Sequence, residues 1–249
     1  MRVISNSKFM RYLILFIPFF LGCKNLMLNA GFQALGVYDE VAKIHVVKSN
    51  LKEIVLLPTH HLGTPQYYDD LHKKIDSLSA LNYFFYTEKV KSDTSQSILR
   101  RKFRKFSGGP VATSGYKKLL DSVVGKKFKL KLKKEIMDQP SYIDLGVPVS
   151  MSDNVDATLE ELIAYYETTY GEIVLEPCDF ETTITKETTC KKYKVAKDVR
   201  NDVIKDFRNN IVLKRIDVEK HNKIAIIYGD AHTPGLLEGL KERGYLLEE

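Results

Sequence analysis

Two segments of the chain repeat one pattern of apolar and polar positions. A short apolar run is followed by a histidine, a Thr-Pro pair and an amphipathic stretch, first at residues 54–78 and again at 224–244. Nearly continuous apolar runs of this length are typical of strands buried on both faces. Thr233 before Pro234 predicts the N-cap of a helix, and Thr64 before Pro65 repeats this signal. We therefore predict an α/β fold (a mixed α+β arrangement is the alternative), with a central sheet flanked by helices and a weak strand-His-helix internal repeat.

The rest of the chain alternates between further strand and helix signals. Residues 41–47 read as a strand that forms a hairpin with 54–57, and the aromatic run 82–88 reads as another strand. Helices are predicted at residues 95–106, 116–124, 158–170 and 195–218, and the third begins with a Thr-x-x-Glu capping box. Residues 127–133 alternate Lys with apolar residues, which favours an edge strand over a Lys/Leu helix. Residues 139–152 are loop-like.

The N-terminus has the features of an export signal. Arg2, Lys8 and Arg11 precede the apolar run 12–21, which is short for a membrane span of roughly 20 residues. The run ends in Leu21-Gly22-Cys23, which resembles a bacterial lipobox with Cys23 as the lipidated residue. We expect a lipoprotein-type signal peptide at 1–22, a linker at 23–40 and one domain at 41–249. Plain secretion and an uncleaved anchor are the alternatives.

The composition and the net charge exclude few classes of protein. The 249 residues are 44% hydrophobic and 28% charged, as in globular domains, with a formal net charge of +6. The lysines are mostly dispersed, so no nucleic-acid partner is expected. We expect the basic residues of the predicted helix 95–106 to form a face exposed to solvent. The functional alternative is that they contact anionic lipid or substrate.

The two cysteines left after lipidation form a candidate pair. In an exported protein, Cys178 and Cys190 predict a disulfide that closes a Thr-rich segment. Metal ligation by these two is the weaker interpretation, because no other Cys or His lies near them in the sequence.

The candidate catalytic and metal-binding residues lie at the ends of the predicted strands. His61, Glu88 and His232 each follow an apolar run, and the carboxyl ends of strands are where α/β folds bind ligands. Imidazole and carboxylate are usual ligands of Zn, Mn or Co and also act as acid and base. A purely structural role is the alternative for each of these three residues. The neighbours His60 and His61 must point apart in an extended segment. No phosphate-binding Gly-rich loop, nucleophile elbow or HExxH motif occurs.

Several of these motifs resemble the TraB/PrgY/Tiki/GumN family. The segment GDAHTPGLLEGLKERGY is similar to the family's closing Gly-x-x-His motif, PTHHLGTPQYYDDL to its first motif, and YFFYTEKV to the strand that ends in its glutamate. Arg208-Asn209 match a pair in the helix before the last strand, and Gln139 and NVDATLEEL resemble the middle region. In the first motif, Pro58 stands where the family has glycine, and proline could shift the loop that presents His61.

The resemblance implies a metal-dependent hydrolase of the cell envelope. It implies a peptidase with His61, His232 and Glu88 around one divalent metal (Mn, Co or Zn), a peptide or protein substrate, and Glu88 as ligand or general base. Arg208 would steady the oxyanion or a substrate carboxylate, with Asn209 orienting it. The alternatives are a lipoprotein, anchored to the membrane through Cys23, that captures a peptide or an iron or haem ligand without catalysis, and an inactive relative.

Overall fold

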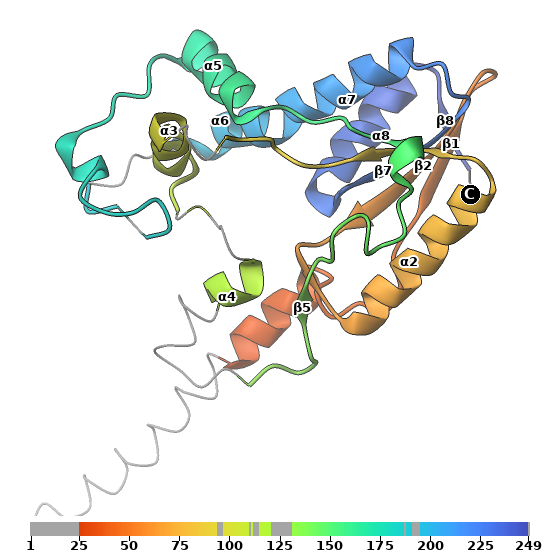
Figure 1. Ribbon diagram of the computed structural model, residues 1–249, viewed down its shortest axis with the longest axis horizontal. Coiled ribbons are helices and arrows are strands. Elements are labelled where there is room, and N and C mark those ends of the chain that lie inside the picture. The colour runs from red at the N-terminus through yellow and green to blue at the C-terminus, as the bar shows by residue number, and fades with distance from the viewer. Residues whose placement is uncertain are drawn as a thin grey trace, which may run out of the picture.

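The computed structural model of the chain describes residues 25–93, 97–109, 111, 115–120, 131–186, 188–190 and 195–248. The predicted α/β fold is confirmed: helices cover both faces of a six-stranded sheet with the order β6-β4-β7-β2-β1-β8 (Figure 1). The strands are β1 His45–Lys48, β2 Glu53–Thr59, β4 Phe84–Thr87, β6 Ser152–Asn154, β7 Lys223–Gly229 and β8 Leu246–Leu247, beside a small pair of β3 Leu62–Gly63 and β5 Met137–Asp138. The longer helices are α2 Pro65–Ala80, α3 Ser97–Ser107, α5 Leu159–Tyr170, α7 Phe207–Val218 and α8 Thr233–Glu242.

The two strands of the repeated pattern lie side by side in the sheet. β2 and β7 pair in parallel along their whole length, from Glu53 opposite Lys223 to Thr59 opposite Gly229. β4 pairs in parallel with β7 on its other side, and β6 with β4. β1 and β2 form the predicted antiparallel hairpin. Four parallel strands therefore end at one edge, where the chain places its candidate site.

The continuous apolar runs are explained by burial on both faces. Leu56 and Ile226 pack into one cluster with residues of α7 and α8, whereas Leu57 and Ile227 pack into another with residues of α2. Side chains of a strand alternate between faces, so a strand covered on both sides needs apolar residues at every position. In Figure 1, α7 and α8 lie on one side of the sheet and α2 lies on the other.

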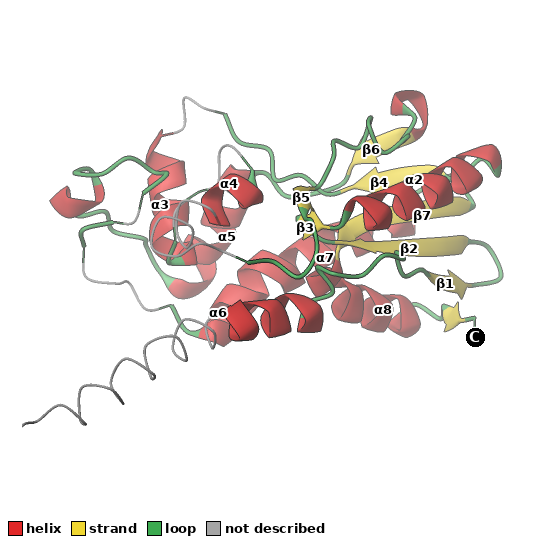
Figure 2. Ribbon diagram, turned by 90° about the horizontal axis from the view of Figure 1, so that it is seen from below, coloured by secondary structure: helices red, strands yellow, loops and turns green. Residues whose placement is uncertain are grey.

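A second helical group lies beyond the carboxyl ends of the parallel strands (Figure 2). It contains α3, the short helices α4 Tyr116–Leu120 and α6 Lys197–Asn201, and α5. A π-helical turn, Asp202–Asp206, joins α6 to α7, so the predicted helix 195–218 is continuous but not regular. The predicted capping box of α5 is confirmed, with Thr158 and Glu161 bonded to each other's backbone N–H groups. This group has its own core, which includes Phe106, Ile163 and Val203.

Some predictions need correction. Residues 25–34 are helical where a linker was expected, and Phe32 packs edge-on against Tyr38. Thr233 does not cap α8, because the 3-10 turn Asp230–His232 runs directly into the helix and gives Thr233 helical angles (φ −53°, ψ −48°). Residues 1–22 and Cys23, and all of 121–130, lie outside the described residues, and 131–133 form no strand.

The expected solvated face of α3 is also wrong for two of its basic residues. Arg104 and Lys105 are buried, with 2% and 6% of their surface exposed. They pack against the segment between Cys178 and Cys190, which are joined by the predicted disulfide (Cα–Cα 5.2 Å). None of the helices in the described ranges combines the length and the hydropathy that a membrane span requires.

Candidate active site at the carboxyl ends of the parallel strands

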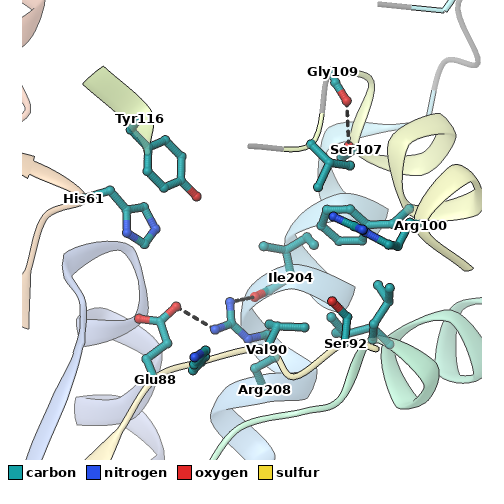
Figure 3. Close-up of a pocket in the computed structure, with 15 residues that line it drawn as sticks. His61, Glu88, Val90, Ser92, Arg100, Ser107, Gly109, Tyr116, Ile204 and Arg208 are labelled. Carbon is teal, nitrogen blue, oxygen red and sulfur yellow. Dashed lines mark hydrogen bonds and ion pairs between the residues drawn. The ribbon is translucent and has the colours of Figure 1, made fainter. Parts of the chain in front are cut away.

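A cavity of about 650 Å³ opens between the sheet edge and the second helical group. Glu88, which follows β4, and Arg208 of α7 line one wall, and His61 and Tyr116 lie beside them (Figure 3). Arg100 of α3 lies across the cavity (Figure 3). The cavity therefore joins residues from both halves of the fold, at the edge where α/β sheets commonly bind ligands.

Glu88 is held rigidly at the end of β4. Its Oε1 accepts from Arg208 Nη2 at 2.6 Å, and its Oε2 accepts from the backbone N–H of Gly229. The Tyr142 hydroxyl donates to the Glu88 carbonyl at 2.8 Å and accepts from its N–H at 3.2 Å. Burial by itself would raise the pKa of Glu88, but Arg208, His232 and the Gly229 N–H together lower it. Glu88 is therefore a carboxylate at neutral pH.

Arg208 has an acceptor for each of its five N–H groups. Nε and Nη2 bind the two oxygens of Asp156 at 2.7 and 2.8 Å, and Nη2 also binds Glu88. Nη1 donates to the Ile204 carbonyl and to His232 Nε2, both at 3.2 Å. A guanidinium with every donor engaged positions its neighbours, and binding an oxyanion would require it to give up a bond. The geometry thus favours a positioning role over the expected contact with substrate.

Asp156 was missed by sequence reasoning, although it lies in the NVDATLEEL segment. Its side chain is fully buried, and burial raises its pKa, an effect that the bonds from Arg208 offset only in part. The available signal was position: Asp156 follows β6, another strand of the parallel set. A buried carboxylate in bidentate contact with a buried arginine fixes the arginine's orientation.

His232 is a buried, neutral imidazole. Its Nδ1 lies 2.7 Å from Asn209 Oδ1, and only Nδ1–H can donate to that carbonyl oxygen. Its Nε2 then carries the lone pair, which accepts from Arg208 and lies 3.6 Å from Glu88 Oε1. Burial, reinforced by Arg208 and opposed by Glu88, lowers the pKa of His232 to about 4. Asn209 therefore orients His232, whereas the sequence suggested that it orients Arg208 or substrate.

His61 lies in the same cavity but apart from the other two predicted ligands. It is exposed and stacks on Tyr116, with ring centroids 4.3 Å apart. His60 points to a separate hollow beside Gly36 and Tyr67, so the two histidines diverge as expected.

Pro58 does not disturb the strand that precedes His61. It pairs opposite Tyr228 in the β2–β7 register, and its carbonyl accepts from the Tyr67 hydroxyl at 2.7 Å. β1 begins at His45, opposite Leu56, so Pro58 lies beyond the β1 pairing. Proline is tolerated in a strand where no ladder partner requires its N–H. Pro58 therefore leaves the β2–β7 pairing intact.

Donor type, charge and spacing decide whether Glu88, His232 and His61 can hold a divalent metal. Glu88, Asp156 and Arg208 sum to one net negative charge around a neutral His232, and Lys89, next to Glu88 in the cavity lining, offsets it. Glu88 and His232 supply suitable oxygen and nitrogen donors 3.6 Å apart. His61 does not join them within 4.8 Å among the described residues, and the Nε2 lone pair of His232 is engaged by Arg208. Glu88 and His232 thus fit a metal in donor type and spacing, but both donor atoms accept from Arg208, which would have to release them, and His61 would have to move.

One other cluster in the described part of the chain could hold a metal ion by spacing. Potential ligand atoms of Glu176, Cys178, Asp179 and Cys190 lie within 4.8 Å of one another. The two sulfurs form the disulfide, so they are not thiolate ligands, and Asp179 is bonded to Lys105 at 3.0 Å.

No protein-family model matches the chain, and neither a curated protein nor a solved structure is significantly similar to it. The resemblance to the TraB/PrgY/Tiki/GumN family stays a prediction based on the motifs above.

Proposed function

We propose that the chain is a hydrolase, acting on peptide bonds, that uses a divalent cation held by Glu88 and His232. The single observation that carries the proposal is the 3.6 Å approach of Glu88 Oε1 and His232 Nε2: Glu88 lines the cavity of about 650 Å³, and the buried His232 lies behind it. Two donors to one metal ion, each about 2 Å from it, have about this separation.

Neighbouring residues orient Glu88 and His232 and set the protonation states that metal binding requires. Asn209 keeps the Nε2 lone pair of His232 free of a proton, and Arg208 sets the distance between His232 and Glu88. When bound, a divalent metal would supply a Lewis acid and a water of lowered pKa. Glu88 is ionised and faces the cavity, so it can hold a cation or accept a proton from water.

Metal titration tests the proposal directly. The full chain, purified in detergent and stripped with chelator, is titrated with Mn²⁺, Co²⁺ and Zn²⁺ by calorimetry. We expect one ion per chain for at least one metal, lost in Glu88→Gln and His232→Asn. His61→Ala weakens binding if His61 moves to complete the site. His72→Ala is the matched control, since His72 is half-exposed on α2 and pairs with Asp76.

A peptide-library digest then separates hydrolysis from capture. Metal-dependent cleavage that Glu88→Gln abolishes supports the hydrolase. Binding of peptides without cleavage favours the alternative of a capturing lipoprotein. Absence of stoichiometric metal binding in the unmodified chain contradicts the metal-dependent mechanism.

The proposed location is the bacterial cell envelope, with a lipid anchor on Cys23. The disulfide between Cys178 and Cys190 supports export, because disulfides persist in oxidising compartments. Labelling of cells with a radioactive fatty acid should mark the protein, and Cys23→Ala should remove the label. An unlabelled chain in the supernatant would instead indicate plain secretion.

A further inference from the structure

The basic helix α3 uses its charged residues in two different ways. It carries five of them between residues 100 and 105, and four of these hold the second helical group together. Arg101 and Arg104 donate to backbone carbonyls of the disulfide-closed segment, Lys105 pairs with Asp179, and Lys102 pairs with Glu167 of α5 at 2.6 Å. These contacts account for most of the helix's unusual charge.

Arg100 is the exception. It is half-buried and lines the cavity (Figure 3), and within the part of the chain that the structure describes it has no hydrogen bond or ion pair. Arg100 lines the cavity without an acceptor among the described residues, while its four basic neighbours are all engaged, so it is available to bind a ligand anion.

The cavity is electrostatically divided. At one wall the Glu88 carboxylate is paired with Arg208, with Asp156 buried behind it and Lys89 next to it in the lining, whereas Arg100 is a cation on the wall opposite (Figure 3). A ligand carboxylate would be repelled by Glu88 and attracted by Arg100, which, unlike Arg208, has no carboxylate partner among the described residues. This polarity orients a ligand with its anionic end at Arg100 and its uncharged part towards Glu88.

The wall next to Arg100 is apolar. Phe103 from the same helix and Leu159 and Leu162 from α5 line it. This surface suits an aliphatic or aromatic side chain beside the anion. The planar fork of one guanidinium matches the two oxygens of a carboxylate.

We infer that Arg100 binds the free C-terminal carboxylate of a peptide whose last residue is apolar, and so selects the substrate. The inference rests on the proposed function for the step of cleavage, but not for binding. It assigns the apolar wall to the last side chain and places the preceding peptide bonds towards Glu88.

The test compares two probes that differ only in the charged group, N-acetyl-leucine and N-acetyl-leucinamide. Each is titrated into the full chain in detergent, and the ¹⁵N side-chain resonance of Arg100 and the Kd are followed. We expect N-acetyl-leucine to bind more tightly and to shift that resonance. Arg100→Gln should weaken its binding about tenfold or more, the value of a charge-assisted hydrogen bond. Arg100→Lys should recover part of the loss.

Two controls keep the result specific. Arg215→Gln removes a half-exposed arginine of α7 and should leave both affinities unchanged. N-acetyl-leucinamide should bind equally to the unmodified chain and Arg100→Gln, which a merely unfolded variant would not do. Equal affinity of the unmodified chain for both probes, or no effect of Arg100→Gln, would overturn the inference. Arg100-dependent binding by a chain that takes up no metal and cleaves no peptide would uphold it while refuting the proposed function.

Discussion

Arg208 and Asp156 form a bidentate ion pair between α7 and the turn after β6. Nε and Nη2 of the arginine lie 2.7 and 2.8 Å from the two carboxylate oxygens, and both side chains are almost completely buried (7% and 0% exposed). The pair joins elements 52 residues apart in the chain. It sets the guanidinium plane from which Glu88 and His232 are both positioned.

Asp156→Asn should destabilise the protein because it leaves the buried guanidinium with less compensation. Removing one partner of a buried pair costs about 3 kcal/mol or more in the free energy of unfolding, measured by urea denaturation. Asp217→Asn is the control, since its pair with Arg243 is partly exposed and should be worth no more than about 1 kcal/mol. Equal effects of the two substitutions would mean that the buried pair contributes no more to the free energy of unfolding than the exposed pair does.

His232 should stay neutral far below the ordinary pKa of histidine. In the metal-free chain, an NMR titration should give a midpoint near pH 4, with the proton on Nδ1. The folded-state pKa lies below the unfolded value of 6.5, so the unfolded chain binds the proton first. This contribution to stability is present above pH 6.5 and is lost as pH falls towards 4. A midpoint near 6.5 would contradict the burial of the ring.

Gly235→Ala should disturb the bond between Asn209 and His232. A Cβ at Gly235 would lie 2.5 Å from Asn209 Nδ2, so the amide must move, although it is bonded to His232. We expect a loss of about 1–3 kcal/mol in stability and a change in the His232 ring resonances. The control, Gly31→Ala, adds a Cβ with no neighbour within 4 Å at an exposed helical position. It should be neutral or stabilising by about 0.5–1 kcal/mol.

Glu219 should make stability depend on acid pH. It accepts from Tyr86 and from backbone N–H groups of Lys220 and His221, and these bonds outweigh burial and lower its pKa to about 2. Its contribution, about 3 kcal/mol at most, is present above the unfolded value of 4.5 and is lost as pH falls towards 2.

The measurement for Glu219 is urea unfolding at several pH values. The difference between the unmodified chain and Glu219→Gln should be large at pH 6 and shrink below pH 4.5. Glu242→Gln, at an exposed position of α8, should show little difference at any pH. A pH-independent difference for Glu219→Gln would mean that its ionisation is not coupled to folding.

The sequence by itself determined the elements whose signals are local. The apolar runs of β2 and β7, Thr64 before Pro65, and the Thr158–Glu161 capping box depend on residues within one turn or one strand of each other. The strand ends carrying Glu88 and His232 could be predicted for the same reason. Burial on two faces leaves its mark at every position of a strand.

Only the tertiary structure decided which of the candidate residues meet. It joined Asp156 to Arg208, turned Asn209 towards His232, and left His61 stacked on Tyr116. It also separated Arg100, which faces the cavity, from the other basic residues of α3. Each outcome depends on packing between segments far apart in the chain. The sequence of one segment does not specify which distant residue will pair with its charge or satisfy its hydrogen-bonding groups.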